Sequence, residues 1–401
     1  MANELVVYTI VHQPRRIRLP ARPLPDKPTI DDFEQCLFDD EMNKFYFTKV
    51  AKYCYYPATE MFLDLVKAGL KLSIAFSVSF LKQAQNWDPK LLDLFRELVK
   101  HPNVELVCSE PYHSFIPLLD LPLFSERMAW ARQYLEDVFG VSPQVTDTTE
   151  MLMSEDIYFA LNNAGFTGAV MDGRPWVMEW RESTHLYHYG RDLRLLTRHY
   201  ELSDDVGYRF SNKEWAEFPL HANKYAQWLR QVWGDFVFIG WDYETFGEHH
   251  SRDTGIFDFM RWLPDEVMKR GMTCLTPSEA IAKYKDNSFY LPLPTFPTTW
   301  AGTGGVEFFL GNPAQQAIFQ LMLRAYNKAR LTKNDQLIDL ALWLTQSDNL
   351  HLIQWFGRSD SQAEVSAYFT PKEWWRLGAD KILWEQQAVY RNFIWAMDKY
   401  L

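Results

Sequence analysis

Side chains that can carry chemistry recur in this sequence directly after short apolar runs. Histidine and carboxylate residues follow four such runs, and they are His12, Glu110 with His113, Glu150, and Asp242 with Glu244, His249 and His250. In parallel α/β folds the active residues cluster at the carboxyl ends of the strands. If the apolar runs are parallel strands, these side chains meet at one face of the fold.

Two of these carboxylates, Glu150 and Asp242, suit the hydrolysis of a glycosidic bond. Each comes just after a predicted strand, over residues 144–148 and 236–241. A glycosidase uses one carboxylate as nucleophile or base and a second one as general acid. From position alone, the alternative is that the two side chains cap helices.

The histidines allow a second interpretation, which is a metal site. The candidate ligands are His12, His113, His249 and His250, with Asp242 or Glu244. Zinc and manganese use such ligands in hydrolysis or deacetylation. The sequence contains no HExxH or HxxxH spacing, so it indicates a metal only weakly. We therefore expect neither a metal nor another cofactor.

The elements that must position these residues alternate between apolar runs and helical patterns. Strands are expected over 4–11, 71–78, 104–108, 144–148, 168–171, 206–210, 236–241 and 273–275. Helices are expected over 39–68, 89–100, 126–139 and 155–164, and a capping box at 276–279 opens another. This alternation predicts parallel βα units and an α/β fold, either a barrel or an open sheet.

The composition and pattern of the sequence change near residue 290. Prolines at 292, 294 and 297 and glycines at 302, 304 and 305 mark a boundary. Beyond it the sequence is mostly helical, over 313–329, 333–345 and 371–401. We expect a βα domain over 1–290 and a helical domain over 291–401.

Charge and composition exclude several classes of protein. The chain of 401 residues has 41 Lys+Arg against 52 Asp+Glu, a net charge of −11, and no basic block. Such a protein is a poor candidate for binding nucleic acid or an anionic membrane. The four cysteines form no CxxC pair, and neither a secretory signal nor a membrane span is visible. We expect a cytoplasmic protein.

The motifs, taken in order, resemble glycoside hydrolase family 57, the α-amylase and 4-α-glucanotransferase family, and in particular its small α-amylase branch. The matching segments are His12-Gln13-Pro14, 104–106 through Glu110 to His113, Thr148-Thr149-Glu150, and Trp241 through Asp242 and Glu244 to His249. Further matches lie at 202–205, 209–211, 275–279, 299–301 and 310–312. The set spans nearly the whole chain, and the segments DYETFGEH and TTE are specific.

The resemblance implies a fold, a reaction and a site. The fold would be a (β/α)7 incomplete TIM-like barrel followed by a C-terminal helical region. The reaction would be a retaining double displacement on α-1,4-glucans without metal, ending in hydrolysis or in 4-α-glucan transfer. Glu150 matches the family nucleophile and Asp242 the general acid/base. The residues that match the lining of the sugar cleft are His12, Glu110, His113, Glu244, His249 and Trp300. The implied partner is an α-glucan or a maltooligosaccharide.

Three segments depart from the family pattern, and one of them, around Pro111-Tyr112-His113, is one residue shorter than usual. Gly302, Gly304 and Gly305 stand where the α-amylase branch carries a charged run after the alanine, and Asn349 stands where a histidine is usual. One alternative is therefore an α-glucan-binding homologue with weak or no turnover. Another is a metal-dependent carbohydrate deacetylase on a related barrel. Turnover of an α-glucan separates the first alternative from the enzyme, and metal content separates the second.

Overall fold

The computed structural model describes residues 1–190 and 192–401, which form two compact units. Unit 1 comprises Met1–Gln13, Tyr46–Pro111 and Pro122–Trp300, and unit 2 comprises Pro14–Phe45, Tyr112–Leu121 and Ala301–Leu401. The sequence predicts a single division at 290/291. The compact units differ from it because two earlier segments pack with C-terminal helices. Within unit 2, the ring centroids of Phe33 and Phe393 are 5.6 Å apart, and those of Tyr112 and Trp343 are 4.7 Å apart.

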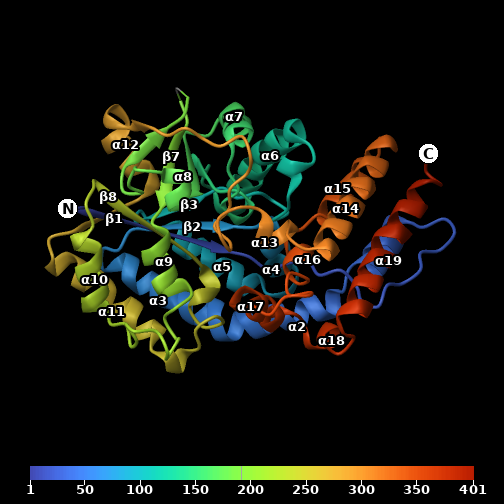
Figure 1. The fold of residues 1–401 in the computed structure, drawn as a ribbon, viewed down its shortest axis with the longest axis horizontal. Coiled ribbons are helices and arrows are strands. Elements are labelled where there is room, and N and C mark those ends of the chain that lie inside the picture. Colours follow the sequence, from blue (N-terminus) through green and yellow to red (C-terminus); the bar gives the residue numbers. More distant parts are fainter. Residues whose placement is uncertain (191) are drawn as a thin grey trace. The chain divides into compact units, whose positions relative to one another are not determined.

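The first sheet of unit 1 contains only parallel strands (Figure 1). Its order is β3-β2-β1-β8, and β9 also pairs with β1. The bounds are β1 Glu4–Val11, β2 Leu72–Phe76, β3 Val104–Val107, β8 Phe236–Asp242 and β9 Thr273–Leu275. All five expected strands are confirmed, with ends shifted by at most two residues. Every residue of β1 and β2 is buried, which explains their continuous apolar sequences.

The second sheet of unit 1 has the order β10-β6-β7-β5-β4. Its bounds are β4 Val145–Thr146, β5 Gly168–Asp172, β6 Leu186–His188, β7 Arg194–Arg198 and β10 Phe289–Tyr290. The strands β4, β5 and β7 are parallel, whereas β6 runs antiparallel to β7. The expected strands over 144–148 and 168–171 are confirmed as β4 and β5.

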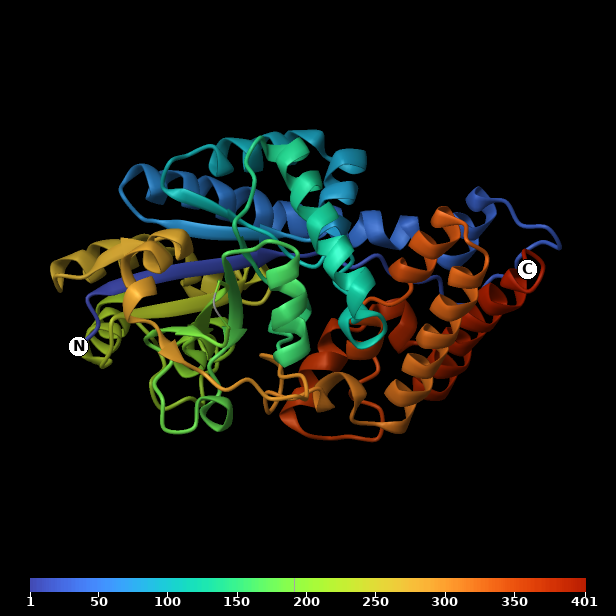
Figure 2. The same cartoon turned by 90° about the horizontal axis from the view of Figure 1, so that it is seen from above.

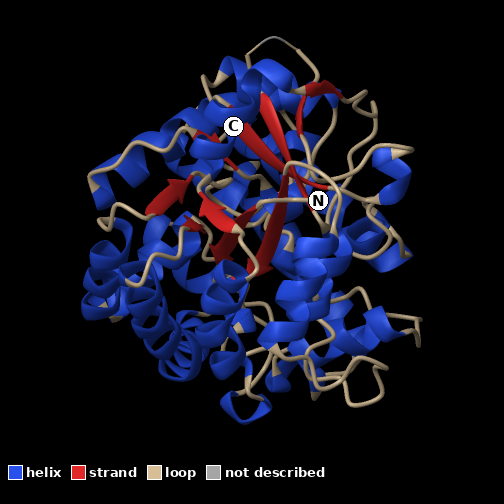
Figure 3. Ribbon diagram, turned by 90° about the vertical axis from the view of Figure 1, so that its left-hand side faces the viewer, coloured by secondary structure: helices blue, strands red, loops and turns tan. Residues whose placement is uncertain are grey.

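The two sheets join at both ends and close a barrel. Cys108, directly after β3, forms a parallel bridge with Thr146 of β4. At the other junction, the backbone N–H of His199, directly after β7, donates to the carbonyl of Phe238 in β8 at 2.8 Å. The barrel strands are therefore β1, β2, β3, β4, β5, β7 and β8, with helices on their outer side (Figure 3). This is the predicted (β/α)7 incomplete TIM-like barrel.

The strand expected over 206–210 is wrong. Tyr200–Gly207 form helix α9, which His199 caps and which buries Leu202, Ser203 and Val206. The barrel strand of this region is β7, whose sequence is RLLTR. Its arginines at both ends hide a short buried strand, because they break the apolar run by which a strand is recognised.

Helices follow the barrel strands in unit 1. They are α3 Tyr56–Lys67, α4 Val78–Trp87, α5 Pro89–Val99, α6 Leu121–Phe139, α7 Glu155–Asn163, α8 Pro175–Met178, α9, α10 Ala222–Gln231, α11 Ile256–Lys269 and α12 Pro277–Tyr284. In α5, Asp88 caps the N–H of Leu91 and Pro89 begins the helix. Proline fits there because the first helical N–H has no helical acceptor. The capping box expected at Thr276 and Glu279 is confirmed in α12.

The interior of the barrel is filled with side chains. Tyr8 and Phe238 stack with ring centroids 5.9 Å apart, and Met151 lies in the same buried cluster. Gly240 leaves room for these neighbours. A Cβ at Gly240 would lie 3.2 Å from Met151 Cε and 3.4 Å from the Tyr8 ring. The turn after β4, which contains Met151, therefore packs against β8 in the interior.

Unit 2 is helical. It contains α1 Ile30–Leu37, α13 Glu307–Leu310, α14 Pro313–Leu331, α15 Asp335–Trp343, α16 Asp348–His351, α17 Ser361–Phe369, α18 Lys372–Trp375 and α19 Ala379–Met397. Another helix, α2 Asp40–Val50, crosses from unit 2 into unit 1. Figure 2 shows α14, α15 and α19 side by side. The helical stretch expected over 371–401 consists of two helices, because Gly378 adopts φ +80° and separates α18 from α19.

The described part of the chain contains no helix that is long and apolar enough to cross a membrane.

Candidate active site

Polar residues lie at the carboxyl end of every barrel strand. They are His12 after β1, Ser77 after β2, Glu110 after β3, Asp147 and Glu150 after β4, Asp172 in β5, Arg198 in β7, and Asp242 and Glu244 at and after β8. Strand direction therefore brings most of the sequence-predicted residues to one end of the barrel, as expected for parallel βα units.

Glu150 is fixed by Trp300 through two hydrogen bonds. The indole Nε1 of Trp300 donates to Glu150 Oε2 at 2.6 Å, and its backbone N–H donates to the Glu150 carbonyl at 3.0 Å. Glu150 lies in the short 3₁₀ turn Thr149–Met151 and has φ +56°. A positive φ in a residue other than glycine costs about 1–3 kcal/mol and persists only where the surroundings enforce it. The backbone is therefore held in an unusual shape at this carboxylate.

Asp242 is the last residue of β8 and pairs with Ile10 of β1. The preceding residue, Trp241, is buried and donates its indole N–H to the Ser203 carbonyl at 2.9 Å, which anchors this strand end. The pKa of Tyr8 is raised by burial and by the nearby carboxylates of Asp147 and Asp242. The end of β4 and the end of β8 thus contribute acids around the same phenol.

The neighbours of Glu150 and Asp242 in sequence also meet inside the barrel. Met151 follows Glu150, and its Cε lies 3.2 Å from the position of a Cβ on Gly240. Gly240 stands two residues before Asp242. The two carboxylates therefore extend from backbone segments whose adjacent residues are packed together.

Glu244 is buried and held by the residues after β1. The Tyr55 hydroxyl donates to Glu244 Oε1 at 2.5 Å, and the backbone N–H of His12 donates to the same oxygen at 3.3 Å. Burial and the nearby charge of Asp242 raise the pKa of Glu244 to about 8. At neutral pH this carboxyl is mainly protonated, so it can donate as well as accept a hydrogen bond.

The remaining predicted binding residues divide between the units. In unit 1, Glu110 is fully buried and accepts a 3.2 Å hydrogen bond from Thr149, and the His249 backbone N–H donates to the Glu244 carbonyl at 2.8 Å. The His12 ring lies 2.8 Å from the Ser77 hydroxyl. His113 belongs to unit 2, where its carbonyl accepts a 2.9 Å hydrogen bond from the Ser347 N–H.

The second histidine of the pair at 249–250 is structural. His250 Nδ1 lies 2.8 Å from the Ser211 hydroxyl, and Nε2 lies 2.9 Å from the Val206 carbonyl. Burial lowers the pKa of this imidazole. Within the residues that the structure describes, no group of three or more His, Cys, Asp or Glu side chains is arranged to hold a metal ion.

Three residues at the strand ends escaped the sequence analysis. Asp147 accepts a 2.5 Å hydrogen bond from Tyr8, and Asp172 forms a buried ion pair with Arg198 (Nη1 to Oδ1, 2.9 Å). Asp147 was missed because the predicted strand over 144–148 extends past it, whereas β4 ends at Thr146. The Asp172–Arg198 pair could not be recognised without β7, which supplies the arginine.

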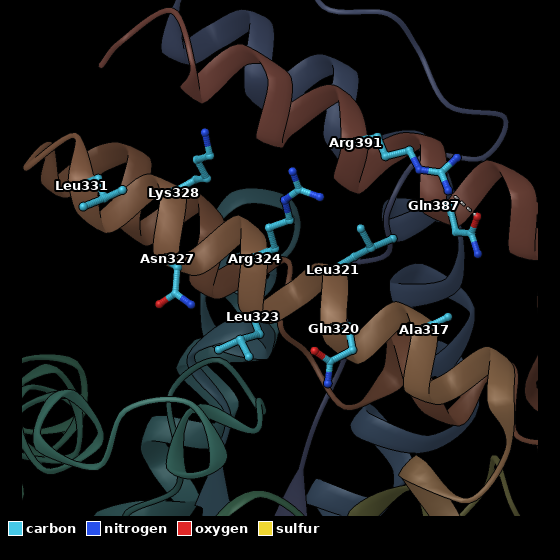
Figure 4. A pocket seen from close by; sticks show the side chains of 10 residues that line it. All are labelled: Ala317, Gln320, Leu321, Leu323, Arg324, Asn327, Lys328, Leu331, Gln387 and Arg391. Atoms are coloured by element: carbon cyan, nitrogen blue, oxygen red, sulfur yellow. Dashed lines mark hydrogen bonds between the residues drawn. The ribbon is translucent and has the colours of Figure 1, made fainter.

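Two surface grooves are lined by other residues. One, of about 600 Å³, runs along α14 and α19 of unit 2 and is lined by Leu321, Arg324, Lys328 and Arg391 (Figure 4). The other, of about 590 Å³, lies in unit 1 and is lined by Phe218 and Trp262 among others. Neither contains a sequence-predicted site residue.

Comparison with known proteins connects this geometry to a family. The sequence model described as Glycosyl hydrolase family 57 matches residues 6–294. A protein of Methanocaldococcus jannaschii named "Putative alpha-amylase" is 33% identical over 344 residues, which cover 83% of this chain and 73% of that protein.

Solved structures share the fold at low sequence identity. The GH57-type branching enzyme of Pyrococcus horikoshii has a TM-score of 0.67 and 14% identity, covering 98% of this chain and 95% of that one. The 4-alpha-glucanotransferase of Thermococcus litoralis has a TM-score of 0.65 and 15% identity, covering 93% of this chain but only 61% of that one. The family match runs from within β1 to beyond β10 and includes Glu150 and Asp242. This chain belongs to glycosyl hydrolase family 57.

Proposed function

We propose that this protein is a retaining glycoside hydrolase that acts on α-1,4-glucans, with Glu150 as nucleophile and Asp242 as general acid/base. The observation that carries the proposal is the hydrogen bond from the Trp300 indole to Glu150, which lies in the 3₁₀ turn after β4. Asp242 is the last residue of β8. The "Putative alpha-amylase" relative and the 4-alpha-glucanotransferase support the substrate class.

The chemistry divides into two displacements. The Glu150 carboxylate attacks the anomeric carbon while Asp242 gives a proton to the departing glycosidic oxygen, which leaves a glycosyl ester on Glu150. Asp242 then takes a proton from water or from a sugar hydroxyl, which releases the sugar as hydrolysis or transfer product. The indole N–H of Trp300 suits the nucleophile, because a hydrogen bond to a carboxylate favours its charged form.

Five other candidate residues of unit 1 would hold the glucan around this pair. They are His12, Glu110, Glu244, His249 and Trp300. The protonated carboxyl of Glu244 would donate to a sugar oxygen, whereas an ionised one would only accept.

Product analysis tests the proposal. The protein is incubated with maltoheptaose, products are separated by chromatography, and the first anomer released is identified by NMR. We expect α-configured products, with both shorter and longer chains if transfer occurs. A fluorinated glucosyl substrate should trap the intermediate on the peptide that contains Glu150. Inverted products, or a label on another residue, would overturn the assignment.

A lack of any turnover, with maltoheptaose still bound, would favour the glucan-binding alternative. Release of acetate from an acetylated glycan in place of glucan turnover would favour the deacetylase.

A further inference from the structure

We propose that Arg174, Asp172 and Arg198, here called the arginine clamp, are positioning residues that hold Trp300 against Glu150. The inference rests on the proposed function, since Glu150 is the nucleophile in it. The clamp acts through Trp300 and needs no contact with the sugar.

The clamp is built at the ends of two neighbouring strands. Asp172 ends β5 and Arg198 ends β7, and the sheet register pairs these two residues. Arg198 Nη1 donates to Asp172 Oδ1 at 2.9 Å, and Arg174 Nε donates to Asp172 Oδ2 at 2.6 Å. Each carboxylate oxygen of Asp172 therefore accepts a hydrogen bond from a different arginine.

Both arginines also reach Trp300. Arg174 Nη2 donates to the Trp300 carbonyl, and the guanidinium carbon of Arg198 lies 5.4 Å from the centroid of the indole ring. That distance is within the range of a cation–π contact. The clamp thus engages the backbone and the ring of the residue that binds Glu150 through its Nε1.

Arg198 additionally ties the clamp to the strand that carries Asp242. Its Nε donates to the Gly240 carbonyl at 2.9 Å, and its Nη2 donates to Asp204 Oδ1 at 2.6 Å. The Arg198 side chain is thereby engaged at all three nitrogens, and the residue is only 5% exposed. Because all three of its guanidinium nitrogens are hydrogen-bonded within the protein, we assign Arg198 a positioning role and no contact with the substrate.

The charges of this cluster balance. Two arginines, Arg174 and Arg198, face two carboxylates, Asp172 and Asp204. Burial opposes the charge on Arg198, but Asp204 and Asp172 raise its pKa above the usual value. Burial raises the pKa of the Asp172 carboxyl, and the charges of Arg198 and Arg174 oppose this shift. The effect of the clamp on Glu150 comes from the placement of the indole.

A readout that needs no turnover tests the first step. Tryptophan is labelled with ¹⁵N, and the Trp300 Nε1–H signal is assigned as the one missing in Trp300→Phe. Glu150→Gln should move that signal, because it replaces the charged acceptor. Arg174→Met should move or broaden it as well. Arg209→Met is the matched control, because Arg209 pairs with Asp205 on α9 at 2.7 Å. An unchanged indole signal in Arg174→Met would overturn the clamp even if the protein is an active glycosidase.

Kinetics test the second step. Arg174→Met should lower kcat about tenfold to hundredfold with little change in KM, because it loosens an interaction with a reacting group. The acid limb of the rate profile should move to higher pH, since Glu150 loses a donor to its charged form. Arg174→Lys should recover part of the loss.

A double-mutant cycle separates positioning from a general loss of stability. If Arg174 acts through Trp300, adding Arg174→Met to a Trp300→Phe variant should lower kcat little further. Two results would contradict the proposal. One is that the two substitutions lower kcat by independent factors that multiply in the double variant. The other is that the pH–rate profile of Arg174→Met equals that of the wild type. We choose Arg174 for substitution because Arg198 is buried. Removal of Arg198 would take an ion-pair partner from both Asp172 and Asp204 and so endanger folding.

Discussion

The hydroxyl of Tyr55 donates a 2.5 Å hydrogen bond to Glu244 Oε1 across 189 residues of sequence. Tyr55 lies at the end of a π-helical segment, Ala51–Tyr55, directly before α3. Pro57, which has no N–H, follows within the first turn of α3 and favours this break in the normal helical pattern. The widened turn belongs to the candidate site because the hydroxyl of its last residue binds a site carboxyl.

The first prediction concerns the pH dependence of stability. Folded Glu244 keeps its proton up to about pH 8, because burial and Asp242 raise its pKa, whereas an unfolded glutamate loses it near pH 4.5. Between these values the folded state binds more protons, so the free energy of unfolding falls as the pH rises and levels off above pH 8. The loss is at most roughly 5 kcal/mol, at 1.36 kcal/mol per pKa unit.

Urea unfolding at pH 5 and pH 8 measures this effect. Glu244→Gln should lose much less stability than the wild type over that interval, because the amide does not titrate. Glu248→Gln is the control. Glu248 lies on the same loop as Glu244 and pairs with Lys49. This variant should lose as much stability between pH 5 and pH 8 as the wild type does. Parallel behaviour of wild type and Glu244→Gln would refute the raised pKa.

The second prediction concerns the two catalytic candidates. Glu150→Gln and Asp242→Asn should each lower kcat on maltoheptaose by orders of magnitude, with folding and KM little changed, because each removes a group that acts in the transition state. Asp156→Asn, on the exposed side of α7, is the matched control and should keep wild-type rates. Near-normal turnover in either site variant would reject its assigned role.

The third prediction concerns distance. In a crystal structure of the protein, the carboxyl groups of Glu150 and Asp242 should be about 5–6 Å apart, the separation of a retaining enzyme. A separation near 9 Å would leave room for a water molecule and would indicate inversion instead.

Much of the barrel could be predicted because its strands are buried on both faces. Such strands give the continuous apolar runs that mark β1, β2 and β8, and the polar residues after them follow from strand direction. β7 could not be found, since RLLTR has charged ends and only a short apolar centre. Val206 looks like part of a strand but lies on the buried face of α9.

The candidate site likewise has features that the sequence reveals and features that it does not. Glu150, Asp242 and Glu244 are visible because they follow recognisable strands. The contacts that set their properties are between distant segments, such as Trp300 with Glu150 and Tyr55 with Glu244. No local pattern encodes these pairs, because only the closed barrel brings the segments together.

The fourth prediction concerns metal. The purified protein should contain no stoichiometric zinc or manganese, and a chelator should leave its glucan turnover intact, because the proposed mechanism uses only the two carboxylates. Elemental analysis together with rates before and after dialysis against chelator measures both. One metal per chain whose removal abolishes activity would favour the deacetylase.

The fifth prediction concerns the glycine loop at the start of unit 2. Gly302 and Gly304 have φ of +55° and +96°, so the loop depends on residues that tolerate the left-handed region. By the resemblance to the small α-amylase branch, Gly302 takes the place of an aspartate that directly follows the alanine in that branch. The loop lacks the charged hydrogen-bonding groups of that branch, so we expect slow turnover of soluble starch.

Restoring the aspartate makes this testable. Aspartate is among the few residues that adopt such a φ readily, and a Cβ at Gly302 would lie 3.3 Å from the Gln362 amide and 3.4 Å from Phe308 Cβ, so small shifts suffice. A hydrogen bond from a sugar hydroxyl to a carboxylate contributes about 1.5–3 kcal/mol. Gly302→Asp should therefore raise kcat/KM on starch by about tenfold to hundredfold.

Gly302→Asn is the matched control, because asparagine tolerates the same backbone but carries no charge. It should gain less than the aspartate. Initial rates on soluble starch and maltoheptaose for the three proteins decide the matter. If the wild type already degrades starch as fast as a family member with the full motif, and Gly302→Asp changes nothing, the glycines do not limit substrate binding. If Gly302→Asp and Gly302→Asn gain equally, the benefit comes from a stiffer loop and the charge has no part in it.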